Sequence, residues 1–319
     1  MRQLAVAKSS FHPATILGAV MWVALVAGFW VGWVQLSMVE LLFLLAPLIT
    51  VPLAISLTPS LDDSARLVGR KSGRSWTIFA AAVLATLSFF QSEGPKAATL
   101  ASAWFFVCAW LAVQGLRRFL RYRTQSFSQF CFAAGEAYLI VGGTWLVISR
   151  LGLQPLGFQE PIVLLTALHF HFAGFLSAVL AGLTYERLRE SRWSNSLRVA
   201  LAGAVIGPGL LSLAFLVGPK LKLAAVMLIV AGQFGLAAGT IRVAAGMEHL
   251  AGRTMLFFSS GCVLAGMVLA ATWAMGEYPL HPFVDLARME KYHGVLNAVG
   301  FGVCGLLGWT NAVAPKCKA

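Results

Sequence analysis

Stretches of about 20 apolar residues recur along the whole of this 319-residue chain. An α-helix of about 20 residues crosses roughly 30 Å of hydrocarbon, so each stretch is long enough to span a bilayer. The composition agrees, because 59% of the residues are hydrophobic and only 11% are charged, with a mean hydropathy of +0.79. The sequence therefore predicts an all-α, polytopic transmembrane helix bundle and excludes a soluble enzyme with a single anchor.

The apolar stretches divide into about ten predicted spans, which form one integral membrane domain covering residues 1–319. The spans lie near residues 14–34, 38–57, 76–92, 98–116, 127–149, 162–185, 198–217, 221–241, 254–275 and 292–313. No separate soluble domain, low-complexity tract or internal repeat is visible in the sequence. Any function is therefore expected to lie in the spans or in the short loops between them.

The basic residues predict the orientation of these spans. The chain has a net charge of +12, and 18 of its 24 Lys and Arg residues lie at the termini and in the loops that follow even-numbered spans. Because cytoplasmic loops of membrane proteins are enriched in Lys and Arg, both termini are predicted to be cytoplasmic, in a bacterial plasma membrane. This charge is explained by topology and contact with the lipid bilayer, so no nucleic-acid partner is predicted.

Two features of the polar and sulfur-containing residues limit the kinds of site. The predicted outer loop at residues 276–291 is the only outer loop rich in reactive groups, and it includes Asp285 and Glu290. Four cysteines lie within predicted spans without Cys-x-x-Cys or Cys/His ligand spacing: Cys108, Cys131, Cys262 and Cys304. They are interpreted as small core residues, and no metal site or disulfide is predicted.

The span at 162–185 contains two histidines, His169 and His171, two positions apart. At about 100° per residue they lie some 200° apart, so in a regular α-helix they face different neighbours. His169 shares a stripe with Thr166 and Ser177 that could line a cavity, whereas His171 lies among small residues where another helix could approach closely. The remaining arc is predicted to face lipid; it consists of Leu165, Leu168, Phe172, Leu176, Val179 and Leu183.

The last span carries a second polar stripe on one face. It consists of small and polar residues at helical spacing: His293, Asn297, Gly300, Cys304, Gly308 and Asn311. Glu136 lies near the middle of the span at 127–149. If these three spans are neighbours, they would line a cavity in the outer half of the membrane, with Glu136 as its floor and Asp285 in the loop above it.

Two segments together resemble the YndJ-like family of bacterial multi-pass membrane proteins. They are Leu-Thr-Ala-Leu-His169-Phe-His171-Phe-Ala-Gly-Phe and His293-Gly-Val-Leu-Asn297-Ala-Val-Gly-Phe. The resemblance covers mainly these two motifs, with compatible hydropathy over the second half of the chain. It implies a set of family positions: His169, His171, Gly174, Phe175, His293, Gly294, Asn297, Gly300 and Phe301. It implies no reaction and no cofactor.

The polar residues are compatible with several functions. The preferred hypothesis is an intramembrane enzyme, an acid–base isomerase, cyclase or hydrolase of a lipophilic substrate. Its candidate catalytic residues are His169, His171, His293, Asn297, Glu136 and Asp285. One alternative is a haem- or metal-binding protein with histidine ligands, although His-x-His chelates poorly from a helix. Another is a transporter or channel, with Gly207-Pro208-Gly209 breaking a helix at mid-membrane. The last alternative is a protein without a small-molecule site, whose polar residues serve packing alone.

Overall fold

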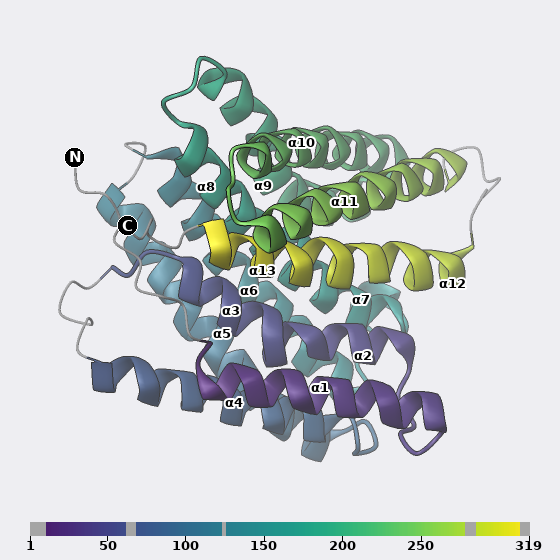
Figure 1. The fold of residues 1–319 in the computed structure, drawn as a ribbon. Coiled ribbons are helices and arrows are strands. Elements are labelled where there is room, and N and C mark those ends of the chain that lie inside the picture. Colours follow the sequence, from purple (N-terminus) through teal and green to yellow (C-terminus); the bar gives the residue numbers. More distant parts are fainter. Residues whose placement is uncertain (1–10, 62–67, 123–125, 278–284, 313–319) are drawn as a thin grey trace.

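The computed structural model describes residues 11–61, 68–122, 126–277 and 285–312, which form helices joined by turns, without a strand in these ranges. The elements in chain order are α1 (Pro13–Val31), α2 (Met38–Leu45), η1 (Ala46–Thr50), α3 (Val51–Leu57), α4 (Val68–Ser88), α5 (Pro95–Tyr122), α6 (Phe127–Leu151), η3 (Pro155–Gly157), α7 (Ile162–His169), η4 (Phe170–Leu176), α8 (Ser177–Leu188), α9 (Ser194–Val217), α10 (Pro219–Ala245), α11 (Leu250–Glu277), α12 (Leu286–Arg288), η5 (Met289–His293), η6 (Leu296–Val303) and α13 (Cys304–Ala312). The predicted all-α bundle is confirmed (Figure 1).

Nine helical segments in the described ranges are long and apolar enough to cross a membrane. Three of these are composite: α2 continues through η1 into α3, α7 through η4 into α8, and α12 through η5 and η6 into α13. A tenth long helix, α4, is less apolar because three of its first seven residues are basic. The α1 helix begins and α13 ends at the same end of the bundle, as an even number of crossings requires (Figure 1).

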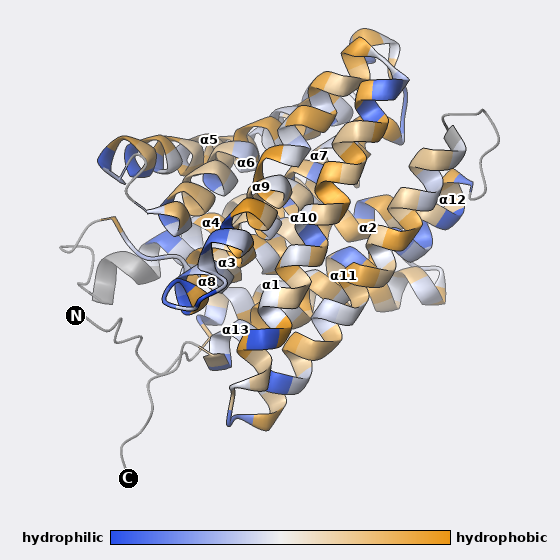
Figure 2. Ribbon diagram, turned by 90° about the horizontal axis from the view of Figure 1, so that it is seen from above, coloured by the Kyte–Doolittle hydropathy of each residue, from blue (hydrophilic) through white to orange (hydrophobic). Residues whose placement is uncertain are grey.

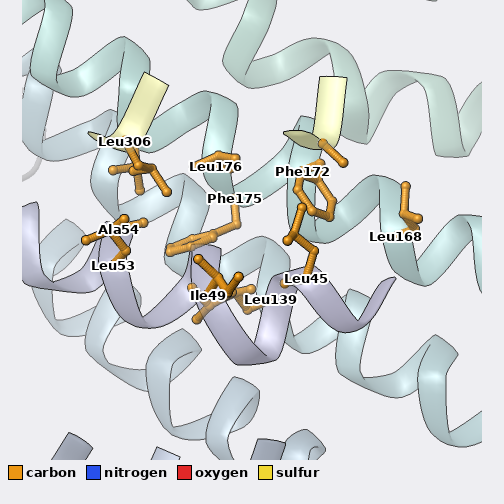
Figure 3. Packing of buried hydrophobic residues seen from close by; sticks show 14 of the residues in the cluster. Leu45, Ile49, Leu53, Ala54, Leu139, Leu168, Phe172, Phe175, Leu176 and Leu306 are labelled. Carbon is orange, nitrogen blue, oxygen red and sulfur yellow. The ribbon is translucent and has the colours of Figure 1, made fainter. Parts of the chain in front are cut away.

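Two composite helices form the centre of the bundle. Of the most apolar window in each helix, 78% of the residues are buried in Met38–Leu57 and 72% in Ile162–Leu188, against 17% in α1. The two central helices contact each other through η1 and η4. Figure 3 shows this packing, with Ile49 of the first helix close to Phe175 of the second. Each central helix is therefore surrounded mainly by protein.

The predicted lipid-facing arc of the span at 162–185 is wrong. Leu168, Phe172, Leu176, Val179 and Leu183 are all buried in the structure. The apolar arc was assigned to lipid because hydrocarbon tails and apolar side chains are equally compatible with leucine and phenylalanine. In a helix at the centre of a bundle the same residues pack against neighbouring helices instead.

The outer surface of the bundle is apolar, as a bilayer requires. Large hydrophobic side chains such as Trp30, Phe106, Val199 and Val217 are exposed on helices at the periphery. In Figure 2 hydrophobic residues extend along the helices, and strongly hydrophilic ones gather near helix ends and turns. This distribution places the hydrocarbon region across the middle of the helices.

The Gly207-Pro208-Gly209 segment does not break its helix, because α9 is continuous and contains Pro208 within it. The Tyr138 hydroxyl of α6 donates to the Val205 carbonyl at 2.8 Å and accepts from the Gly209 amide at 3.2 Å. These two backbone groups would bond to each other in a regular α-helix. The tyrosine thus satisfies backbone groups next to the proline. The helix break that a transporter of this kind would need is not present at this position.

The predicted outer loop at residues 276–291 is shorter than expected. The α11 helix continues to Glu277, and helical structure resumes at Leu286, so the final helix begins six residues before residue 292. His281 lies outside the described residues. The side chain of Asp285 accepts from the Arg288 amide at 2.7 Å and therefore caps the N-terminus of the last helix, a local role that favours this helix start.

Candidate functional site

Both histidine motifs include π-helical turns. His169 is the last residue of α7, and His171 lies in η4. His293 is the last residue of η5, and Asn297 lies in η6. Short π-helical insertions are rare and occur frequently at functional sites, because they change the direction in which side chains leave the helix. An α-helical wheel drawn from the sequence cannot reveal them.

His171 is completely buried and both of its ring nitrogens are hydrogen-bonded. Its Nδ1 lies 2.8 Å from the Ala167 carbonyl, and its Nε2 accepts from the indole Nε1 of Trp104 at 3.0 Å. Since a carbonyl can only accept and an indole N–H can only donate, the ring is neutral with its proton on Nδ1. Phe43 packs edge-on against the ring, with centroids 5.3 Å apart. His171 therefore joins three helices and has no nitrogen left for chemistry.

Gly142 of α6 provides the space that the His171 ring occupies. A Cβ at position 142 would lie 2.6 Å from Nδ1 of His171 and 3.2 Å from the Ala167 carbonyl. We therefore expect Gly142→Ala to destabilise the protein by about 1–3 kcal/mol through overpacking, lowering the Tm measured in detergent. Gly261→Ala is the matched control, because nothing lies within 4 Å of the added Cβ; a Gly142→Ala protein as stable as Gly261→Ala would contradict this packing.

His169 differs from His171 in both exposure and bonding. Its Nδ1 lies 2.8 Å from the Leu165 carbonyl, so Nδ1 carries the proton and Nε2 presents a lone pair. No described residue bonds to that Nε2. The side chain is exposed, unlike that of His171. His169 lies about 10 Å along the helix axis from Ile162, well inside the apolar region.

His293 has the same bonding pattern as His169. Its Nδ1 lies 2.9 Å from the Gly266 carbonyl of α11, which again places the proton on Nδ1 and leaves Nε2 as an acceptor. No described residue bonds to this Nε2 either. The His293 ring is half-buried, and the elements that carry the two histidines, α7 and η5, both pack against α2. The structure thus brings together two imidazoles that the sequence separates by 124 positions.

The elements next to the two imidazoles are α2, η4 and η6. The α2 helix packs against both α7 and η5 and so lies beside the pair. Deeper in the membrane η4 contacts η6, where a Cβ on Gly302 would lie 2.9 Å from Leu176 and 3.5 Å from Phe172. The two histidine-bearing helices therefore approach closely beyond the imidazoles.

Asn297 holds His293 in place rather than pointing toward the other imidazole. Its Nδ2 donates to the His293 carbonyl at 2.8 Å. A Cβ on Gly266 would collide with the same amide nitrogen, so Asn297 packs directly on the residue whose carbonyl accepts the hydrogen bond from His293 Nδ1. Asn297 and Gly266 together fix the orientation of the His293 ring.

The polar stripe of the last helix packs mainly against α11. Added Cβ atoms on Gly300 and Gly308 would lie 2.5 Å from Cys262 and 2.6 Å from Leu256. The Ser259 hydroxyl of α11 donates to the Phe301 carbonyl at 2.9 Å. The prediction that this stripe faces protein is confirmed, and below Asn297 it is a close helix–helix contact.

Glu136 lies apart from the histidines, in a buried ion pair with Arg118. Arg118 Nε and Nη2 donate to the two carboxylate oxygens at 3.1 and 3.0 Å. Nη1 donates to the Gln129 side chain, and Nη2 also donates to the Pro59 carbonyl. The predicted span at 98–116 ends before Arg118 and so places it in a loop, among the basic residues that indicate orientation. Because α5 extends to Tyr122, Arg118 is instead helical and buried; the length of that helix was the available signal.

The remaining candidate residue, Asp285, is exposed and forms its ion pair with Arg288 at 3.4 Å. In the described part of the chain no group of three or more His, Cys, Asp or Glu side chains is placed to hold a metal ion. The arrangement that can do chemistry is therefore the pair of neutral imidazoles, each with Nδ1 anchored and Nε2 available to take a proton. Trp104, which the sequence did not single out, donates a hydrogen bond to Nε2 of His171 and so occupies the second nitrogen of that ring.

Comparison with known proteins places these residues in a family context. A family model described as YndJ-like protein matches residues 41–301. The "Uncharacterized membrane protein YndJ" of Bacillus subtilis (strain 168) is 25% identical over 206 residues, which cover 65% of this chain and 37% of that protein. The chain thus spans well under two thirds of this relative's length. No solved structure matches the chain.

Proposed function

The chain belongs to the YndJ-like family of membrane proteins, and from this premise we propose that it is an intramembrane enzyme that transfers protons on a lipophilic substrate. His169 and His293 are the proposed catalytic bases, and Asn297 and Gly266 position His293. The observation that carries the proposal is the contrast among the three histidines. His171 has both nitrogens bonded within the core, whereas His169 and His293 each retain an Nε2 without a partner in the described residues.

The cost of an exposed polar group in hydrocarbon supports this assignment. Ionisable side chains within a span normally face a cavity or find partners, because an unpaired polar atom in lipid costs free energy. A histidine needed only for packing would be expected to have both ring nitrogens hydrogen-bonded within the protein, as His171 does. An exposed His169 with an unpaired nitrogen is instead expected where a ligand approaches, and its place within an apolar span favours a substrate that arrives from the lipid.

The chemistry requires no further reactant. One Nε2 removes a proton from an acidified C–H or O–H bond of the substrate, giving an imidazolium and a delocalised substrate anion. The same proton then returns to a different atom of that anion, from the imidazolium or through the neighbouring imidazole, and the resting neutral pair is regenerated. The net reaction is an isomerisation, which conserves all atoms and electrons.

The site lies in the half of the bundle that faces outward if both termini are cytoplasmic. This orientation rests on the 18-to-6 distribution of Lys and Arg. We expect a fluorescent protein fused after Ala319 to fluoresce and an alkaline phosphatase fused at the same point to be inactive in bacterial cells. The opposite pair of results would reverse the orientation and place the histidines in the inner half.

Lipid profiling of cells is the experiment that tests the function. We expect a strain lacking this gene to accumulate one lipophilic species and lose an isomer of equal mass relative to its parent. Wild-type protein should restore the profile, whereas His169→Asn should not, even when it is present in the membrane at the same level. Restoration by His169→Asn would contradict the proposed role. A species that is redistributed across the membrane without chemical change would favour transport over catalysis.

A further inference from the structure

A groove lies between α9 and α10 beside the end of α8. This is the opposite end of the bundle from the histidine pair, and it is the cytoplasmic end if the predicted orientation holds. The volume of the groove is about 190 Å³. Its lining includes three small residues, Ala200, Gly235 and Ala238, and two exposed side chains, Trp193 and Arg242. The groove therefore combines a narrow apolar slot with a cationic, aromatic entrance.

Two guanidinium groups lie at this entrance. The Cζ atoms of Arg192 and Arg242 are 5.0 and 5.2 Å from the centre of the Trp193 ring. The nearby carboxylates belong to Glu186 and Glu190, and both interact with Arg189, at 3.1 and 3.9 Å. No described carboxylate lies within ion-pair distance of Arg192 or Arg242. Among the described residues, the two positive charges on this aromatic ring thus have no carboxylate partner.

The start of α9 adds to the positive potential. This 24-residue helix begins at Ser194, and its N-cap residue, Trp193, makes no side-chain hydrogen bond to the first turn. Ser196 of that turn lines the groove. The first amide groups of a helix carry partial positive charge and attract anions. The guanidinium groups of Arg192 and Arg242 and the N-terminus of α9 therefore all favour a negatively charged group at this entrance.

We infer that this groove binds an anionic phospholipid, with the headgroup phosphate at Arg192 and Arg242 and the beginning of one acyl chain in the slot. A lipid fits better than a soluble anion because the inner wall is apolar and the groove opens where Trp193 is exposed, as expected at a membrane interface. The groove is too small for a whole lipid, so it selects the junction between headgroup and chain. Basic pockets between helices on the cytoplasmic side suit such lipids.

Native mass spectrometry of the full chain in neutral detergent can test this site. We expect phosphatidylglycerol to bind more tightly than phosphatidylcholine, and Arg192→Gln with Arg242→Gln to weaken only phosphatidylglycerol, by about 10- to 30-fold. Ala238→Leu should also weaken binding, because the exposed Ala238 lines the slot and a larger side chain would fill it. Arg117→Gln is the control, as it removes an exposed charge away from the groove.

The outcomes separate the lipid from other anions. Unchanged phosphatidylglycerol affinity in the double arginine variant, measured on protein with wild-type Tm, would overturn the site. Unchanged affinity in Ala238→Leu would overturn the role of the slot. Competition by inorganic phosphate or by glycerophosphoglycerol at the same concentration as the lipid would show that the entrance binds a free phosphate group instead.

Discussion

Glu136→Leu is expected to lower the free energy of unfolding by about 3–5 kcal/mol, because it leaves the Arg118 guanidinium buried without its carboxylate. The side chains of the pair are only 4% and 7% exposed, so solvent can compensate little. Arg118 also donates to Gln129 and to the Pro59 carbonyl. Loss of the carboxylate is therefore expected to loosen the contacts among α5, α6 and the segment after α3. The measurement is the Tm and the denaturant midpoint of the purified protein in detergent.

The double variant Arg118→Met with Glu136→Leu is the control for this prediction. Replacement of a buried ion pair by apolar residues of similar size is often neutral or stabilising, because the desolvation cost of both charges disappears. We expect the double variant to recover most of the lost stability. If it is as unstable as Glu136→Leu, the pair does not act as a unit and the loss has another origin.

His169→Asn and His293→Asn are each expected to reduce turnover of the substrate by about 10²- to 10⁴-fold, the usual range for loss of a general base. Asparagine can still place an amide near the position of Nδ1, so the hydrogen bonds to the Leu165 and Gly266 carbonyls can persist. It offers no basic nitrogen at the position of Nε2. The change thus removes the proposed function while retaining the anchoring contact.

His249→Asn is the matched control histidine. Its Nδ1 accepts from the Gly252 amide at the start of α11, and asparagine is also a good residue for that capping role. We expect turnover by His249→Asn to equal that of wild type. An equal loss of turnover in this control would mean that histidine replacement lowers turnover by destabilising the protein and not by removing a catalytic base.

The sequence predicted the helices well because the length of an apolar stretch is a local property. The ends of the predicted spans agree with the helices to within a few residues in most cases, and the stripe on the last helix does face protein. The arc from Leu168 to Leu183 was assigned wrongly because lipid and a helical neighbour select the same side chains. Only the position of that helix at the centre of the bundle decides between them.

The candidate site was predicted in part. The sequence identified His169 and His293 as residues that could share one site, yet it gave equal weight to His171 and Glu136. The difference depends on partners that are distant in the chain: Trp104 for His171 and Arg118 for Glu136. It also depends on π-helical turns next to His169 and His293, which follow from tertiary packing and leave no periodic signal in the sequence.

The most direct test of the account is turnover by purified, folded protein in which both His169 and His293 are asparagine. The substrate is the lipid species identified by profiling, and His249→Asn and the Arg118→Met with Glu136→Leu variant are measured in parallel. We expect the double histidine variant to retain wild-type Tm and to lose at least about 100-fold in turnover, whereas both controls remain active. Turnover within about twofold of wild type, well below the effect of losing a general base, would contradict the claim that the two free imidazole nitrogens form the catalytic site.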